Sequence, residues 1–228
     1  MDAPAGSSGL RGDSHAQEPN RIQRAIVRRA AEARATVPDL ELSADIEMGA
    51  CLVLVRDHGH SLTAVLAKAC ALALRAVPRA NGAYRDGRFE LYERVNVGVL
   101  CETEDAYVVP TVLDADAKSL GELTTELDAL ATRARDGSLT PPELAGATFT
   151  LADFGALEIP RWAALVNPQQ AAMLVAGAIR SVPIVHDGTI VPGQMATLTL
   201  GCDHRILYPT DAARWLTHVR RRLEEGTL

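Results

Sequence analysis

One histidine of this sequence stands where a rigid element could aim it. His204 lies in the stretch LGCDHRILYP, between an apolar run that is typical of a β-strand and a helix that would begin at Pro209. A neutral imidazole can accept a proton near pH 7, which suits a general base. The alternative is a structural histidine, and a strand-end position by itself favours that alternative.

The other histidines and the cysteines give no sign of a metal site. No pair of histidines has metal-ligand spacing with acidic neighbours. The four cysteines lie far apart and form no CxxC pair. We therefore expect no bound metal, and we expect reduced, mostly buried cysteines of the kind found in cytosolic proteins.

Composition limits the class of protein. The chain has 228 residues, of which 47% are hydrophobic and only 4% aromatic, so it can form one sizeable α/β domain with an aliphatic core. A formal charge of −6 without a basic tract argues against nucleic acid as the partner. We find no run of about 18 apolar residues and no secretory signal, so we expect no membrane span and a cytoplasmic location.

Hydrophobic periodicity predicts both helices and strands around this histidine. Residues 1–20 are rich in Gly, Ser, Ala and Pro, and we expect a disordered tail there. The predicted helices are 21–36, 61–77, 119–134 and 209–225. The predicted strands are 40–48, 94–102, 107–113, 147–155, a short strand ending at Val166, 171–185 and 195–203. Residues 80–92 should form a hairpin, and 50–55 could be helix or strand. This order predicts an α/β fold (an α+β two-layer sandwich), with a mixed sheet and helices on one face.

Several segments resemble, in the same order, the catalytic domain of the 2-oxo acid dehydrogenase acyltransferases, the dihydrolipoyl acyltransferase family. CDHRILYPTDAARWL resembles the family's D-H-R-x-x-D-G segment and the helix after it. GATFTLADFG resembles its G-G-T-F-T-I-S-N-L-G strand, and LVNPQQAAMLVAGAI resembles its I-N-P-P-Q-A-A-I-L-x-V-G segment. Two further stretches match, beginning at Arg21 and Val95. The resemblance covers about residues 20 to 226, so it is much more specific than a lone DHR.

The resemblance implies a chloramphenicol acetyltransferase-like fold that assembles as a homotrimer, with active sites in tunnels at the subunit interfaces. It implies acetyl-CoA as the acyl donor, entering one end, and a small-molecule acyl acceptor entering the other. His204 matches the family's general base. It would take a proton from a thiol or hydroxyl, which then attacks the thioester in a direct ternary-complex transfer. A positioned base accelerates such a reaction about 10²–10⁴-fold.

The resemblance also implies a support for the active-site loop. In the family, an aspartate four residues after the catalytic histidine pairs with an arginine of the first helix. Here that position is Tyr208, and Arg29 is the best match for the arginine, so the ion pair cannot form. We expect this change to affect rigidity more than the base itself, and whether Asp211 takes over is open. We assign Asp203, Arg205, Tyr208 and Arg29 to loop support.

A second departure concerns the oxyanion of the tetrahedral intermediate. The family's serine that donates a hydrogen bond to this oxyanion falls on Ala152, which has no side-chain donor. Losing such a donor typically costs about 10²–10³-fold in rate. We name Thr150, Thr148 and Asp153 as oxyanion or substrate-binding candidates. Strand propensity explains the two threonines as well, and a turn before Gly155 explains the aspartate.

The domain organisation favours one functional interpretation over two others. About 20 residues precede the fold, and Met1 with an ordinary tail favours a complete small protein, an acyltransferase domain over 21–228 without lipoyl domains. Such lone domains resemble the tetronate acetyltransferases of polyketide biosynthesis. We therefore expect O-acetylation of a tetronate-like hydroxymethyl group. The alternatives are the dihydrolipoyl acyltransferase core of a 2-oxo acid dehydrogenase complex and a catalytically inactive trimeric scaffold.

Overall fold

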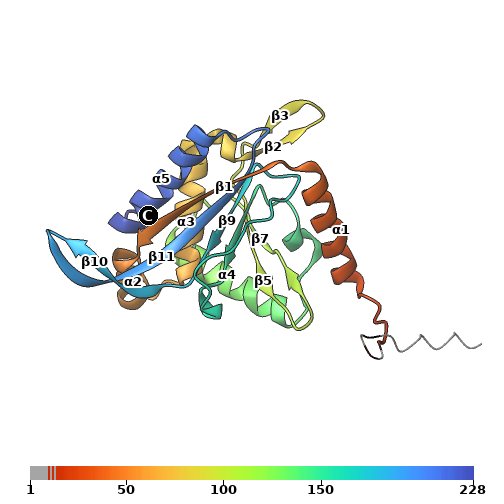
Figure 1. Cartoon of the computed structure of the whole chain (residues 1–228), viewed down its shortest axis with the longest axis horizontal. Coiled ribbons are helices and arrows are strands. Elements are labelled where there is room, and N and C mark those ends of the chain that lie inside the picture. The colour runs from red at the N-terminus through yellow and green to blue at the C-terminus, as the bar shows by residue number, and fades with distance from the viewer. Residues whose placement is uncertain (1–9, 11, 13) are drawn as a thin grey trace, which may run out of the picture.

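The computed structural model describes residues 10, 12 and 14–228, so the predicted disordered tail lies mostly outside the described residues. The strands of the main sheet in this part of the chain are β1 (Asp39–Glu47), β4 (Val97–Val99), β7 (Thr111–Val112), β8 (Phe149–Asp153), β9 (Ala172–Ala176), β10 (Arg180–His186) and β11 (Thr189–Asp203). Their order is β1-β11-β9-β8-β4-β7, and β10 pairs with β11 outside this path (Figure 1). Strands β4, β8 and β9 run parallel, while the other pairs run antiparallel, so the predicted mixed sheet is confirmed.

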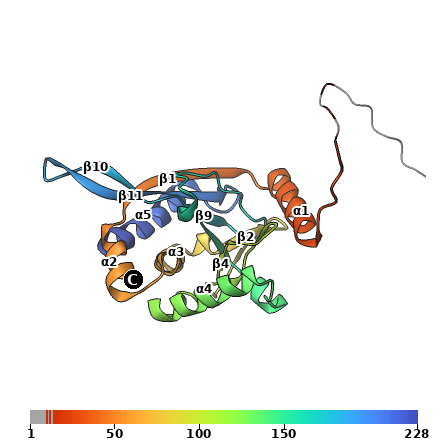
Figure 2. The same cartoon turned by 90° about the horizontal axis from the view of Figure 1, so that it is seen from below.

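Helices cover one face of this sheet. The helices are α1 (Arg21–Thr36), α2 (Gly49–His58), α3 (Leu62–Ala76), α4 (Leu120–Arg135) and α5 (Pro209–Glu225). Figure 2 shows α2, α3, α4 and α5 on the same side of the sheet, whereas α1 lies at the end away from the projecting β10–β11 hairpin. The prediction of helices on one face is therefore confirmed for all of them except α1, which flanks the sheet.

The predicted 61–77 helix is the centre of the core. Ser61 caps α3, because its hydroxyl accepts the backbone N–H of Ala64 at 3.2 Å. Most residues of α3 are buried, and many are alanines that let the helix pack closely between the sheet and the helices α4 and α5. The largest core side chains, Phe149 of β8 and Trp215 of α5, pack with tilted rings whose centroids lie 5.2 Å apart. This packing anchors β8, which carries Thr150 and Asp153, and α5, which follows His204.

The predicted 80–92 hairpin is confirmed, whereas the predicted strands 94–102 and 107–113 are each divided into two strands that belong to different sheets. The 80–92 hairpin consists of β2 (Gly82–Arg85) and β3 (Arg88–Leu91), joined at Asp86 and Gly87, whose φ angles of 49° and 76° match a tight hairpin turn. Two minor strands, β5 (Cys101–Glu102) and β6 (Tyr107–Val108), form a second hairpin, and the short 3₁₀ helices are η1 (Pro78–Ala80), η2 (Pro141–Leu144) and η3 (Gly155–Leu157). The undecided stretch 50–55 belongs to α2. Among the described residues, no helix has the length and apolar character needed to cross a membrane.

The face of the sheet opposite α3 is covered by the segment 154–171. The rings of Phe154 and Trp162 in this segment stack with centroids 4.5 Å apart. The apolar cluster between this segment and the sheet consists of Val37, Ala152, Ala164, Val166, Met173 and Val175. Ala152, at the position of the family's serine, is therefore enclosed by this segment on the face away from the main core.

Two strand predictions in this region are wrong. Residues 171–185 form two strands, β9 and β10, and no strand ends at Val166. The break falls at Ala178, whose N–H donates to the carbonyl of Ile159 in the covering segment at 2.9 Å. The backbone at this point thus bonds to the covering segment instead of continuing the sheet, a long-range contact that local periodicity does not reveal.

We expect Gly177→Ala to lower the free energy of unfolding by about 2–4 kcal/mol. A Cβ at this position would overlap the backbone carbonyl of Pro160, so the covering segment would have to move away from the sheet. Gly121→Ala in α4 is the matched control, because a Cβ there meets no atom within 4 Å. This control should stabilise the helix by about 0.5–1 kcal/mol. Urea unfolding measures both variants, and equal stability of Gly177→Ala and wild type would contradict the close approach.

Candidate active site

The backbone around His204 is held on both sides. The N–H of Asp203, at the end of β11, donates to the carbonyl of Ala171 at 2.8 Å, and the N–H of His204 donates to the carbonyl of Pro38 at 3.0 Å. The carbonyl of Asp203 accepts the N–H groups of Ile206 and Leu207, which turns the chain toward α5. The His204 side chain is exposed in this single chain. A fixed backbone therefore presents the imidazole at the surface, as the strand-end position predicts.

The neighbours of His204 form a pair with each other. The Asp203 side chain is fully buried and accepts Nε and Nη2 of Arg205 at 2.9 and 2.7 Å, together with the Arg205 backbone N–H at 3.0 Å. These hydrogen bonds raise the pKa of the Arg205 guanidinium above its usual value. The guanidinium also lies over the ring of Tyr84, 4.7 Å from its centroid. This arrangement ties Arg205 to the end of β11 and to the β2–β3 hairpin, and the loop-support role of Asp203 and Arg205 stays a prediction.

Asp203→Ala should destabilise the protein by about 3 kcal/mol, because it leaves the partly buried Arg205 without its carboxylate. Asp211→Ala is the matched control. Asp211 pairs with Arg214 at 3.2 Å within α5, so it does not replace the family's aspartate as a partner of the first helix. This exposed pair should contribute about 1 kcal/mol or less. Thermal unfolding compares the two variants, and equal losses would show that burial of Asp203 adds nothing.

Thr150 and Arg29 line the same cavity. This cavity has a volume of about 100 Å³ and lies between α1 and β8, with Asn167 and Met173 on its other side. Thr150 is 8% exposed, and its hydroxyl donates to Oε1 of Gln170 at 2.8 Å. The hydroxyl therefore offers lone pairs rather than a hydrogen to the cavity. Sequence reasoning missed Gln170, although it stands in the LVNPQQ segment that resembles the family.

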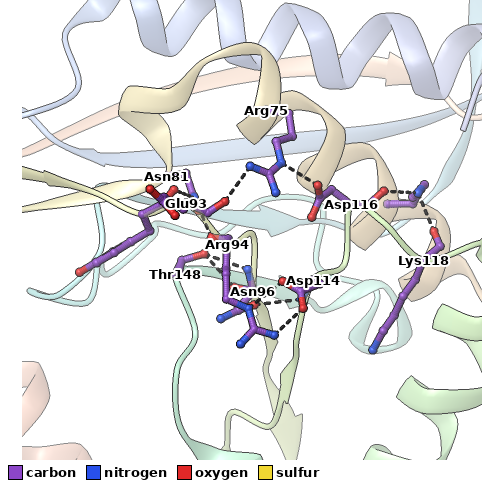
Figure 3. Close-up of polar contacts among 11 residues, drawn as sticks. Arg75, Asn81, Glu93, Arg94, Asn96, Asp114, Asp116, Lys118 and Thr148 are labelled. Carbon is purple, nitrogen blue, oxygen red and sulfur yellow. Dashed lines mark hydrogen bonds and ion pairs between the residues drawn. The ribbon is translucent and has the colours of Figure 1, made fainter.

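Thr148 belongs to a different environment. Its hydroxyl accepts the N–H of Asn96 at 3.0 Å and donates to the carbonyl of the same residue at 3.1 Å. Figure 3 shows this pair inside a polar network with Arg94 and Asp114. The Asn96 side chain in turn holds the N–H of Asp114 and the carbonyl of Gly146, both at 2.9 Å. In this structure the hydroxyl hydrogen of Thr148 already satisfies a backbone carbonyl, and a role of Thr148 as an oxyanion donor stays a prediction.

A second cavity, of about 300 Å³, lies at the end of β8 on the other side of Leu100, which lines both cavities. Asp153 lines it, and its two carboxylate oxygens accept the Thr63 hydroxyl at 2.9 Å and the Gly155 N–H at 3.0 Å. The interaction with Gly155 is the turn contact that was the alternative explanation of this residue. Burial raises the pKa of the Cys101 thiol in the same cavity, so this cysteine is not an activated nucleophile.

The sheet register keeps His204 away from both oxyanion positions within one chain. Thr199 of β11 pairs with Val175 of β9, and Val175 pairs with Ala152 of β8, so these residues form one row across two strand spacings. His204 lies five residues further along the chain. With standard strand dimensions, the Cα atoms of His204 and Ala152 are roughly 19 Å apart, and those of His204 and Thr150 roughly 14 Å. A base must reach its proton directly or through one water. One chain therefore does not bring His204 to Ala152.

Tyr208 and Arg29 also lie in different places. Arg29 is exposed on α1 beside Thr150, whereas the Tyr208 ring stands edge-on to the His204 ring, with centroids 6.2 Å apart and an interplanar angle of 85°. On its other side, Tyr208 contacts Arg79, whose guanidinium carbon lies 5.1 Å from the tyrosine centroid. The structure thus brings Tyr208 to His204 and leaves Arg29 with the cavity.

Comparisons with known proteins agree with this architecture. Residues 11–228 match the family described as 2-oxoacid dehydrogenases acyltransferase (catalytic domain), and the chain belongs to this family. It is 32% identical over 213 residues to the dihydrolipoyllysine-residue acetyltransferase component of the Zymomonas mobilis pyruvate dehydrogenase complex, covering 90% of this chain and 48% of the relative. The Bacillus subtilis component is 30% identical over 218 residues, covering 91% and 49%. This chain thus spans about half the length of the curated relatives that it matches.

Solved structures confirm the predicted fold. Azotobacter vinelandii dihydrolipoamide acetyltransferase, studied for the role of a serine, a histidine and an asparagine in its catalytic mechanism, superimposes with a TM-score of 0.89 at 23% identity, covering 99% of this chain and 98% of that chain. The cubic core of the pyruvate dehydrogenase multienzyme complex gives 0.89 at 24% identity, with the same coverage. Chloramphenicol acetyltransferase gives 0.56 at 13% identity, covering 86% and 94%. The chain therefore belongs to an acyltransferase family and has a chloramphenicol acetyltransferase-like fold.

Proposed function

We propose that this chain transfers an acetyl group between CoA and a dihydrolipoyl thiol, with His204 of one copy serving the cavities of a neighbouring copy. The sheet register carries this proposal, because it separates His204 from Ala152 by roughly 19 Å within one chain. The exposed imidazole is free to face a second copy. A homotrimer with three shared sites is the assembly that we propose, and a cubic core among the similar structures supports a symmetric assembly.

The proposed reaction needs one base. The thiol of the acceptor gives its proton to the imidazole of His204, and its sulfur attacks the thioester carbonyl of acetyl-CoA. The tetrahedral intermediate then collapses, the bond to the CoA sulfur breaks, and the imidazolium returns the proton to the departing thiolate. The acyl group never becomes attached to the protein, since donor and acceptor meet at the same base.

The choice of a thiol acceptor rests on the relatives, which are dihydrolipoyllysine-residue acetyltransferases. The serine and asparagine studied in the Azotobacter enzyme stand at the same sequence distances from its histidine as Ala152 and Tyr208 stand from His204 here. This spacing supports the placement of His204 at the catalytic position. The relatives favour the dihydrolipoyl alternative over the tetronate acceptor that the lone-domain argument predicted.

We keep hydroxyl acceptors as a second candidate, because the serine and asparagine positions named for the Azotobacter enzyme fall on Ala152 and Tyr208 here. A hydroxymethyl acceptor is therefore the second arm of the test.

A cytoplasmic location is a further part of the proposal, whereas the Arabidopsis thaliana relatives are described as mitochondrial.

The decisive assay is release of free CoA from acetyl-CoA with dihydrolipoamide, and separately with hydroxymethyl acceptors, using wild type and His204→Ala. We expect wild type to release CoA with dihydrolipoamide and the variant to lose this activity. Turnover with alcohols alone would replace the thiol acceptor by the hydroxyl acceptor. Absence of turnover with every acceptor, in a folded oligomer, would favour the inactive scaffold.

A further inference from the structure

Aromatic and arginine side chains form a continuous stack beside His204. The Tyr208 ring lies edge-on to the imidazole, at 6.2 Å between centroids. The Arg79 guanidinium lies between two aromatic rings, with its central carbon 5.1 Å from the Tyr208 centroid and 5.0 Å from the Phe89 centroid. Phe89 in turn contacts Tyr84 of the same hairpin at 6.1 Å. The stack therefore joins the β2–β3 hairpin to the imidazole.

Rigid elements hold both ends of this stack. Tyr208 is the N-cap residue of α5, and its carbonyl accepts the N–H of Ala212 at 2.9 Å. Arg79 lies in η1, directly after Pro78 ends α3, and the N–H of Ala80 closes this turn on Val77 at 3.0 Å. Neither backbone can shift without disturbing a helix end. The Tyr208 ring therefore has the Arg79 guanidinium on one side and the imidazole on the other.

We propose that Tyr208 is a positioning residue, and that its ring, held by Arg79, fixes the orientation of the His204 imidazole. Two observations support this role. The ring is the aromatic group paired with His204, and it forms a cation–π contact with Arg79 on its far side. This inference rests on the proposed function of His204 as the base.

The aromatic ring of Tyr208, rather than its phenol hydroxyl, fixes the orientation of the imidazole. Its hydroxyl forms no hydrogen bond among the described residues, whereas its ring meets the imidazole in an edge contact and lies under the Arg79 guanidinium. A small misplacement of a catalytic group can cost about 100-fold in rate. Tyr208→Leu should therefore lower kcat by about 10–100-fold and change KM for acetyl-CoA and dihydrolipoamide by less than about threefold.

The test compares variants of the assembled protein by steady-state CoA release. Tyr208→Phe keeps the ring and should restore kcat to within about threefold of wild type. Arg79→Met removes the cation behind the ring and should lower kcat by about 3–10-fold, again with KM unchanged. Arg88→Met is the matched control, because Arg88 is an exposed arginine of the β2–β3 hairpin. This variant should behave as wild type. Circular dichroism and gel filtration establish that each variant is folded and assembled.

Three kinetic outcomes overturn the inference. The first is a folded Tyr208→Leu with wild-type kcat. The second is a Tyr208→Phe that loses as much as Tyr208→Leu, which would make the hydroxyl the working group. The third is a rise in KM with unchanged kcat, which indicates a binding role. If Tyr208→Leu fails to fold, Arg79→Met decides in the same way, with an unchanged kcat overturning the proposal.

A crystal structure of Tyr208→Leu separates this inference from the proposed function. If the wild type shows no turnover, the proposed function fails, and the orientation of the imidazole still decides the positioning role. We expect one His204 rotamer in wild type and at least two in Tyr208→Leu. The same single rotamer in both structures would overturn the role of Tyr208, whether or not the protein is active.

Discussion

His204→Ala should lower kcat for acetyl transfer by about 10²–10⁴-fold, the largest effect that we expect from any single substitution. The reason is that the imidazole accepts the proton of the attacking thiol and, as imidazolium, returns it to the departing thiolate in the proposed reaction. Its side chain is exposed in the single chain and forms no hydrogen bond among the described residues. Stability should therefore change by no more than about 0.5 kcal/mol, so the loss is catalytic. Steady-state CoA release and thermal unfolding measure the two quantities.

The control for this substitution is His58→Ala. His58 is exposed on α2, as His204 is exposed in its loop, so both variants remove a surface imidazole. His58→Ala should keep wild-type kcat. A folded His204→Ala that retains more than a third of the wild-type rate would show that another group accepts the proton.

Ala152→Ser should raise kcat by about 10–100-fold, because a donor to the oxyanion is typically worth about 10²–10³-fold. Ala152 is 1% exposed and lies on the same face of β8 as Thr150, which lines the 100 Å³ cavity. The hydroxyl of Thr150 donates to Gln170, so it does not supply this hydrogen bond. A serine would therefore add a donor that the present chain lacks. The measurement is kcat with dihydrolipoamide at saturating acetyl-CoA.

Ala164→Ser is the matched control for this gain. Ala164 belongs to the same apolar cluster as Ala152 but lies on the covering segment, so its hydroxyl should not raise the rate. A folded Ala152→Ser with unchanged or reduced kcat would mean that the oxyanion of this chain is stabilised elsewhere, and that the serine position is no longer part of the reaction.

Local signals in the sequence are sufficient to predict most of the helices and strands. Ser61, Pro78 and the Asp86-Gly87 turn each act within a few residues, so the α3 boundaries and the β2–β3 hairpin follow from the sequence. The strand over 171–185 could not be predicted correctly, since its interruption depends on a hydrogen bond from Ala178 to a segment 19 residues earlier in the chain. Periodicity carries no information on such contacts.

The candidate site likewise combines features that the sequence predicts with contacts that only the folded chain shows. The apolar run before His204 predicts its position at the end of a strand, and the resemblance predicts its role. Asp203 and Arg205 are predicted as loop support, but their pairing with each other is seen only in the structure. The contacts of Tyr208 with Arg79 and of Thr150 with Gln170 join distant segments, and only the folded chain shows them. The separation of His204 from Ala152 depends on the strand order, which a sequence alone does not provide.

The central claim is that the imidazole of one copy serves the cavity of another, and co-expression of two inactive variants tests it most directly. His204→Ala lacks the base, and Ala30→Trp fills the 100 Å³ cavity from α1. Each homotrimer alone should be inactive. In a mixed trimer, a site is intact when its imidazole comes from an Ala30→Trp chain and its cavity comes from a His204→Ala chain. Random mixing gives this combination at about a quarter of the sites, so about a quarter of wild-type activity should return. Mixed trimers with no more activity than the parent variants would contradict a shared site.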